Sequence, residues 1–278
     1  MSLEQDFLNE LVDAIKNDRL TLPTLPEVAL KIRDAVSDPE VNSSTLSNVI
    51  GQDAALAARI IKVANSPLLR GAVTVDNLQL AITRMGINFV RNLATGLAME
   101  QMFQATHDAV DKRLRRSWEH SLEVASISHV LASHFTKLKP DQATLAGLVH
   151  EIGILPILTL AEDNPEILEQ EAVLDKIIQR LHGKVGKAIM KAWEFPAELQ
   201  DVPLGCTDFA RDSGSVADYV DVVTVAKIQS YTSENTPYPN LDIASVPAFT
   251  KLGLAGEVDV HEVDELAEEV EEAKQALA

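Results

Sequence analysis

The sequence predicts an all-α fold built from two packed helical subdomains. Apolar residues recur with the period of amphipathic helices through most of the 278 residues. No stretch alternates apolar and polar residues as a half-buried strand would, and no internal repeat is evident. Aromatic residues make up only 4% of the chain. The core must therefore consist of aliphatic residues, which suits helix-on-helix packing.

The first half of the chain is expected to form a series of short helices. A first amphipathic helix at residues 3–16 is interrupted by Pro23 and Pro26, because proline fixes φ and disfavours helix at the preceding residue. Asn42 and Asp53 are suited to cap two helix starts, and Gly86 is suited to end another helix. The helices expected here cover residues 27–37, 42–50, 53–64 and 78–85, followed by one that ends near residue 103.

The second half is expected to contain longer helices. The longest amphipathic run spans residues 108–135. The next helix, from Asp141 to Ala161, should bend near Pro156 because proline removes a helical hydrogen bond. Further helices are expected at residues 165–181, 184–193 and 216–231, with a loop at 203–215 and a proline-rich crossing at 236–247.

These elements predict three parts. Residues 1–105 form an N-terminal helical subdomain, and residues 106–235 form a second helical subdomain. Residues 236–278 form the proline-rich crossing and an acidic amphipathic helix. Because both subdomains have little polar sequence, we expect them to share one core.

The last helix carries a short heptad pattern. Apolar residues follow a 3-4-3-4 spacing from Val263 to Leu277, which is typical of an a/d seam, but about two heptads are short for an autonomous coiled coil. The flanking residues are mostly acidic, so a homodimer along this seam would bring like charges together. We expect this helix to dock onto the body of its own chain; binding a basic partner surface or a second copy is the alternative.

The charge of the chain argues against several kinds of binding, although a small local basic site stays possible. The formal net charge is −18, which argues against general nucleic-acid binding and against adsorption on an anionic membrane. A single cysteine, Cys206, excludes an intramolecular disulfide and a cysteine cluster for zinc. The first residues resemble no signal peptide, and no membrane-spanning run is expected. These observations predict a cytoplasmic protein.

Several segments in order resemble the HDOD family, a distant relative of the HD metal-dependent phosphohydrolases. The most distinctive segment is residues 53–67, DAALAARIIKVANSP. The other segments that carry the resemblance are LPTLPEVAL at 22–30, AITRMG at 81–86, VRNL at 90–93, WEHS at 118–121 and AGLVHEIG at 146–153. The resemblance covers roughly residues 20–230. It implies an HD-like helical bundle in the C-terminal half and a role in bacterial signal transduction.

The resemblance also implies where a metal site would lie. His120 and His150 match the first two metal ligands of the HD enzymes, and His182 resembles another of their histidines. Glu151 stands where the motif has Asp, and its extra methylene displaces the carboxylate. Lys227 stands where the final Asp is expected, and an ammonium offers only hydrogen-bond donors and repels a divalent ion. The stretch around Cys206 also lacks the histidines of related phosphodiesterases.

These substitutions predict a non-catalytic signalling or interaction module with a degenerate HD site. No metal or other cofactor is expected, and we expect Lys227 to occupy the space of the ion and to pair with Glu151. The alternative is a divergent metal-dependent phosphohydrolase, or phosphodiesterase, in which His120, His150 and Glu151 hold Fe, Mn or Zn.

The densest basic run of the chain precedes His120. It consists of Lys112, Arg113, Arg115 and Arg116. One interpretation is a solvated helix face that pairs with the acidic residues of the protein itself. The other is a docking point for a phosphate-bearing small ligand or an acidic partner. A signalling protein is the partner that we expect for the module as a whole.

Overall fold

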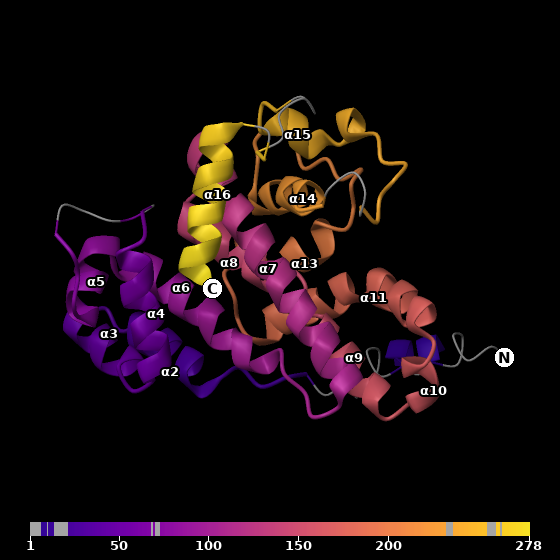
Figure 1. Cartoon of the computed structure of the whole chain (residues 1–278), viewed down its shortest axis with the longest axis horizontal. Coiled ribbons are helices and arrows are strands. Elements are labelled where there is room, and N and C mark those ends of the chain that lie inside the picture. Colours follow the sequence, from indigo (N-terminus) through magenta and orange to yellow (C-terminus); the bar gives the residue numbers. More distant parts are fainter. Residues whose placement is uncertain are drawn as a thin grey trace.

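The computed structural model describes residues 7–9, 11–13, 22–67, 69, 73–231, 236–254, 260–261 and 263–278. Within these residues every regular element is a helix, which confirms the predicted all-α class (Figure 1). Residues 7–9 and 11–13 are helical. The rest of the first expected helix lies outside the described residues.

From residue 22 to residue 98, the described part of the chain forms five helices close to the predicted bounds. They are α2 (Glu27–Ser37), α3 (Ser43–Ile50), α4 (Ala54–Ala64), α5 (Leu78–Met85) and α6 (Ile87–Ala98). The Asn42 side chain accepts hydrogen bonds from the first turn of α3, and Asp53 accepts one from the Leu56 amide of α4. Gly86 has φ of 84°, which favours glycine and separates α5 from α6.

Helix α6 is shorter than predicted. It ends at Ala98 and continues as the 3₁₀ helix η1 (Met99–Met102) rather than as an α-helix through Phe103. Phe103 is buried, and its ring lies 5.2 Å from that of Trp118. The α-helical path therefore ends shortly before this buried ring.

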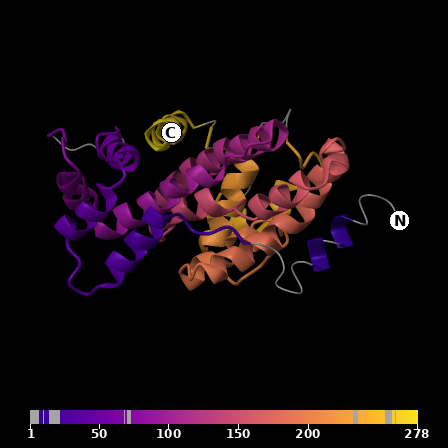
Figure 2. The same cartoon turned by 90° about the horizontal axis from the view of Figure 1, so that it is seen from below.

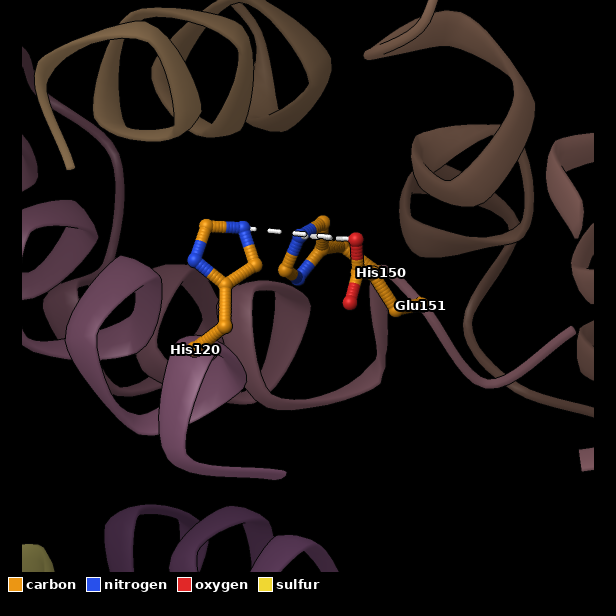
Figure 3. Close-up of side chains that lie close together, drawn as sticks. All are labelled: His120, His150 and Glu151. Carbon is orange, nitrogen blue, oxygen red and sulfur yellow. Dashed lines mark ion pairs between the residues drawn. The ribbon is translucent and has the colours of Figure 1, made fainter. Parts of the chain in front are cut away.

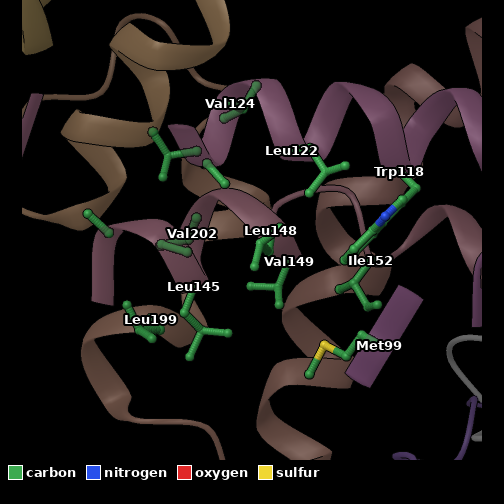
Figure 4. Packing of buried hydrophobic residues seen from close by; sticks show 14 of the residues in the cluster. Met99, Trp118, Leu122, Val124, Leu145, Leu148, Val149, Ile152, Leu199 and Val202 are labelled. Atoms are coloured by element: carbon green, nitrogen blue, oxygen red, sulfur yellow. The ribbon is translucent and has the colours of Figure 1, made fainter. Parts of the chain in front are cut away.

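The centre of the fold is the pair α7 (Asp108–Phe135) and α8 (Pro140–Val149). Figure 4 shows apolar side chains of α7, such as Trp118 and Leu122, beside those of α8, such as Leu148. The two helices approach closely at Gly147, where a Cβ would lie 2.5 Å from the Ala125 Cα. Only a residue without a side chain permits this approach.

The helix predicted from Asp141 to Ala161 is divided into two, so that prediction is wrong. Helix α8 ends at Val149, and α9 (Ile154–Glu162) begins after a turn. The break lies at residues 150–153 rather than at Pro156, which occupies the first turn of α9, where no amide donor is needed. A Cβ at Gly153 would overlap the His182 carbonyl oxygen, so a tertiary contact accompanies the turn.

One stretch, Pro140–Glu162, has the length and mean hydropathy, 1.7, of a membrane-crossing helix; no other part of the described chain does. It is divided into α8 and α9, and 83% of its apolar window is buried inside the protein. Packing in the core therefore accounts for its composition.

The next segment differs from the prediction in where its helices begin and end. The structure has α10 (Pro165–Leu168), α11 (Glu171–Ala192), α12 (Ala197–Gln200) and α13 (Val202–Gly205). Helix α11 passes through Gly183 without a break, although a helix end was predicted there. A Cβ at Gly183 would lie 2.7 Å from the Pro203 carbonyl oxygen. This glycine therefore serves close packing, and α13 occupies the start of the predicted loop.

Helix α14 (Tyr219–Gln229) is buried on all sides and begins three residues later than predicted. Asp218 and Asp221 form a reciprocal capping box at its start. Arg211 and Lys251 each lie 3.1 Å from the Asp221 carboxylate and balance its charge. The 3₁₀ helix η2 (Ile243–Ser245) and helix α15 (Pro247–Lys251) follow.

The last helix, α16 (Asp264–Leu277), packs on the body of the chain, as expected. It lies against α7 and α4, beside the N-terminal helices in both views (Figures 1 and 2). Leu266, Val270 and Leu277 are buried there, and His134 Nε2 lies 2.7 Å from the Glu269 carboxylate. The apolar seam is therefore filled within one chain from Leu266 onward, whereas Val263 at its start is 40% exposed. The buried apolar residues of both halves form a single cluster, as the sequence predicts.

The close approach of α7 and α8 gives a test of the fold. Gly147→Ala is expected to lower the free energy of unfolding by about 1–3 kcal/mol, because the methyl group meets backbone atoms that cannot move separately. Gly96→Ala is the matched control, since its Cβ meets the end of the flexible Leu148 side chain. Urea unfolding of both variants checks this. A larger loss of unfolding free energy in Gly96→Ala than in Gly147→Ala would contradict this prediction.

Candidate functional site

A cleft of about 1220 Å³ lies among α7, α11 and α14. Its lining includes His120 from α7, His182 from α11 and Lys227 from α14. Glu151, from the turn between α8 and α9, and Tyr238, from the proline-rich crossing, also line it. The fold therefore brings four of the five residues predicted for the HD-like pocket to one cleft, and His150 lies directly beside it.

The side chains of His120, His150 and Glu151 converge (Figure 3). His120 Nε2 lies 4.0 Å from Glu151 Oε1, and His150 Nε2 lies 3.9 Å from the same oxygen. One ligand atom from each residue can be chosen so that all three lie within 4.8 Å of one another. These separations suit three ligands of one divalent ion after a small contraction, since each bond would be about 2.0–2.2 Å long.

His150 is held in one orientation. Its Nδ1–H donates to the Gly147 carbonyl oxygen at 2.7 Å, while the buried Nε2 has no hydrogen-bond partner. Burial lowers the pKa of His150 to about 3, so the ring is neutral at neutral pH. A neutral imidazole with a fixed Nδ1–H presents the Nε2 lone pair, which is the form that binds metals.

The Nε2 atom of His120 lies near Tyr231 as well as near Glu151. The Tyr231 hydroxyl lies 3.2 Å from this nitrogen, and the two ring centroids are 5.0 Å apart. Burial lowers the pKa of His120, so this ring is also neutral at neutral pH. Tyr231 therefore competes with an ion for the His120 lone pair.

Glu151 keeps its negative charge in the pocket. Burial alone would raise the pKa of its carboxyl, but the nearby imidazoles and the Lys227 ammonium hold it well below its usual range. The Ser117 hydroxyl donates to Glu151 Oε2 at 2.8 Å. Ser117 precedes His120 by one helical turn of α7, so both contact this carboxylate from the same face.

Lys227 is buried, with 3% of its surface exposed. Burial alone would lower the pKa of its ammonium, but Cys206, Tyr238 and Glu151 together raise it. Burial keeps Cys206 and Tyr238 neutral by raising the pKa of each. Glu151 is therefore the charge that retains the Lys227 proton at neutral pH.

The pairing of Lys227 with Glu151 stays a prediction about charge balance, since the two groups form no contact ion pair. Both residues are described, and no ion pair of 4.0 Å or less joins them. Lys227 nevertheless lowers the pKa of Glu151, His120 and His182. Its charge therefore acts on the whole pocket rather than on one oxygen.

These residues fit a metal ion only in part. The unpartnered His150 Nε2 and the nearby Glu151 oxygen are suitable ligand atoms. Lys227 opposes an ion because its buried positive charge already neutralises Glu151. The structure thus offers three ligands and a permanent cation in the same pocket.

Three contributors to the pocket were missed from the sequence: Ser117, Tyr231 and Tyr238. Ser117 lies three residues before His120, and Tyr231 four residues after Lys227, so helical spacing could have revealed both. Tyr238 comes from the irregular crossing, where no periodicity indicates direction. His182 reaches the cleft as predicted, but its ring lies outside the convergent trio, and its buried Nδ1 has no partner.

The basic run divides into two groups. Lys112, Arg113 and Arg116 line the cleft. Arg113 is already paired, at 2.5 Å from Asp175. Arg115 does not join them, because its side chain is 59% exposed and pairs with Asp111 at 2.7 Å. Successive helical residues are 100° apart, so four neighbours cannot share one face.

The chain matches the model of a protein family over more than half of its length. The model of the HDOD domain matches residues 22–204, which are 183 of the 278 residues. The chain belongs to the HDOD domain family. The matched stretch ends before Lys227 and Tyr231, so the HDOD match does not cover the α14 side of the cleft.

Solved structures resemble this HDOD protein along its whole length. A candidate metal-dependent phosphohydrolase from Shewanella amazonensis SB2B is 33% identical, with both chains fully covered and a TM-score of 0.88. An HDOD domain protein of unknown function from Geobacter sulfurreducens is 22% identical, with 98% and 97% of the chains covered and a TM-score of 0.67. The second likeness shows the fold alone.

A further relative is an uncharacterised protein of Treponema pallidum. It is 26% identical over an alignment of 189 residues that covers 63% of this HDOD chain. The match spans about a third of that relative, 35% of its length.

The remaining histidines of α7 lie away from the cleft. His129 is buried, and its Nδ1 lies 3.0 Å from the Thr144 hydroxyl on α8. His134 contacts α16. Neither joins the trio, as the helical spacing predicts. Burial lowers the pKa of His129 to about 4.

His129 makes the stability of this HDOD protein sensitive to acid. Because its folded pKa of about 4 lies below the ordinary 6.5, the unfolded chain takes up the proton first as the pH falls. Stability should therefore fall from about pH 6.5 toward pH 4. Between pH 7 and pH 5, the free energy of unfolding of His129→Gln should fall by about 2 kcal/mol less than that of wild type.

Urea unfolding at both pH values measures this difference. His107→Gln is the control for the exchange of histidine for glutamine itself, because His107 is exposed whereas His129 is buried. If the free energy of unfolding falls equally in wild type and in His129→Gln, His129 does not cause the loss of stability in acid.

Proposed function

We propose that this chain is a non-catalytic signal-transduction module with a degenerate HD site. It acts in the cytoplasm by binding a protein partner or a small ligand. The observation that carries the proposal is the buried, protonated Lys227 in the pocket of His120, His150 and Glu151.

The physical argument is one of charge balance. A buried carboxylate needs a cation, and in an HD enzyme the metal supplies one. Here the Lys227 ammonium balances Glu151. A divalent ion would have to bind beside an existing positive charge, with no further carboxylate to compensate it.

Other features support binding rather than turnover. The cleft is open to solvent and lined by cationic side chains on α7, whereas the chain as a whole carries a net charge of −18. This overall charge disfavours nucleic acids and anionic membranes as partners. A signalling protein or a phosphate-bearing molecule remains as the class of partner.

A second candidate function is metal-dependent phosphoester hydrolysis. The unpartnered Nε2 of His150 favours it, as does the likeness to the candidate phosphohydrolase of Shewanella amazonensis. His120, His150 and Glu151 would hold the ion, which would supply Lewis-acid polarisation of a phosphoryl oxygen. Ser117 would orient the Glu151 carboxylate.

Replacing Lys227 by an acidic residue distinguishes the two candidate functions. We expect wild-type protein purified without chelator to contain far less than one Fe, Mn or Zn per chain and to hydrolyse no bis(p-nitrophenyl) phosphate. Lys227→Asp should bind more metal, because it removes the cation and adds a carboxylate beside three ligands. Elemental analysis and absorbance assays measure both properties.

Two controls make the test specific. Lys227→Gln removes the charge without adding a ligand, so it should gain less metal than Lys227→Asp. The double variant Lys227→Asp with His150→Ala should lose the gain. Stoichiometric metal in wild type, with turnover that His150→Ala abolishes, would establish the second candidate instead.

A further inference from the structure

One face of α7 presents a row of two cations and one imidazole to the cleft. Lys112, Arg116 and His120 are spaced four residues apart, so they lie along one side of the helix, about 6 Å from one to the next. All three line the cleft. The row therefore leads from exposed cations at the mouth to a buried neutral imidazole at the deep end.

The cations at the mouth are not occupied by the protein's own acids. Lys112 and Arg116 line the cleft from α7, and Lys176 lines it from α11. None of the three forms an ion pair of 4.0 Å or less with a described residue.

Their neighbour Arg113 behaves differently. It pairs with Asp175 at 2.5 Å and with Glu171 at 3.9 Å, which neutralises the acids on the α11 side of the cleft. Asp108 remains as the other carboxylate of the mouth, in the first turn of α7, where the helix dipole favours negative charge. With respect to the described residues, the mouth thus keeps three cations that form no ion pair.

The deep end offers hydrogen-bonding groups without net charge. His182 is buried and lines the cleft, and its Nδ1 has no hydrogen-bond partner. Burial lowers the pKa of His182 to about 4, so its ring is neutral at neutral pH. The rings of Tyr231 and Tyr238, with centroids 6.0 Å apart, provide polar aromatic walls.

We propose that this cleft binds a diphosphate ester of a polar organic group, with the diphosphate at Lys112, Arg116 and Lys176 and the organic group against His182, Tyr231 and Tyr238. This inference rests on the proposed function, because the ligand is held without being hydrolysed.

Charge and size decide this orientation. Three cations at the mouth match a terminal diphosphate, which carries about three negative charges at neutral pH since its last ionisation lies near pH 6. At the deep end the charges of Glu151 and Lys227 balance each other, so the uncompensated positive charge lies at the mouth. Inorganic diphosphate is too short to reach both ends of a row about 12 Å long.

Isothermal titration calorimetry with the four common nucleoside diphosphates (ADP, GDP, CDP and UDP) tests the proposal on the full-length protein. At least one should bind with a dissociation constant below 1 mM, and Arg116→Gln or Lys112→Gln should weaken it about tenfold, the effect of one charge-assisted hydrogen bond. Arg115→Gln is the matched control, because Arg115 belongs to the same basic run but pairs with Asp111 away from the cleft. It should leave the affinity unchanged.

A second comparison tests the deep end. His182→Ala should weaken the nucleoside diphosphate, but it should leave the weaker binding of inorganic diphosphate unchanged. Binding by none of the four nucleotides, or equal weakening by Arg115→Gln and Arg116→Gln, would overturn the proposal. Chromatography of the titrated sample shows whether the nucleotide stays intact. Hydrolysis would refute the non-catalytic function while leaving the site in place, whereas absent binding would leave that function untouched.

Discussion

Helices α7 and α8 meet backbone to backbone at Gly147, and the geometry of the cleft depends on this contact. The absence of a side chain at residue 147 lets α8 approach Ala125 of α7. The carbonyl oxygen of the same glycine accepts the Nδ1–H of His150. One residue therefore sets the distance between the two helices and the orientation of the ring that faces His120. A change at Gly147 would alter the packing and the trio together.

The pocket tolerates its buried charges because they are few and opposite. His120, His150 and His182 are neutral, since burial lowers the pKa of each. The charged groups that remain are Glu151 and Lys227, and each holds the other in its ionised form. Removing one partner alone would leave a buried unpaired charge, which is among the most costly changes in a protein core. The pair therefore constrains which substitutions the site accepts.

Capping residues predicted several helix ends correctly. Helix ends that depend on contacts between distant segments could not be predicted from the sequence. Asn42, Asp53 and Gly86 marked helix ends correctly because capping depends on a few adjacent residues. The turn at 150–153 and the unbroken passage of α11 through Gly183 depend on close approaches to other helices. Their glycines serve packing there, and sequence position alone does not distinguish a packing glycine from one that ends a helix.

The residues of the candidate site could also be predicted only where the sequence indicates how the side chains are arranged. The convergence of His120, His150 and Glu151 was predictable because the resemblance supplied a known arrangement of helices. Arg115 pairs with Asp111 outside the cleft, which agrees with the interpretation of the basic run as a helix face that pairs with the protein's own acids. Tyr238 could not be predicted, because the crossing that carries it has no periodicity to indicate which side chains point inward.

The two candidate functions make opposite demands on the charge at position 227. Hydrolysis requires a carboxylate there or an empty space, so that the charge of Glu151 is left for the ion. Ligand binding without turnover requires Glu151 to be balanced already, because an unbalanced carboxylate at the deep end would repel a phosphorylated ligand throughout the cleft. Lys227 meets the second demand and opposes the first. The same substitution that weakens a metal centre thus makes the cleft compatible with an anion at its mouth.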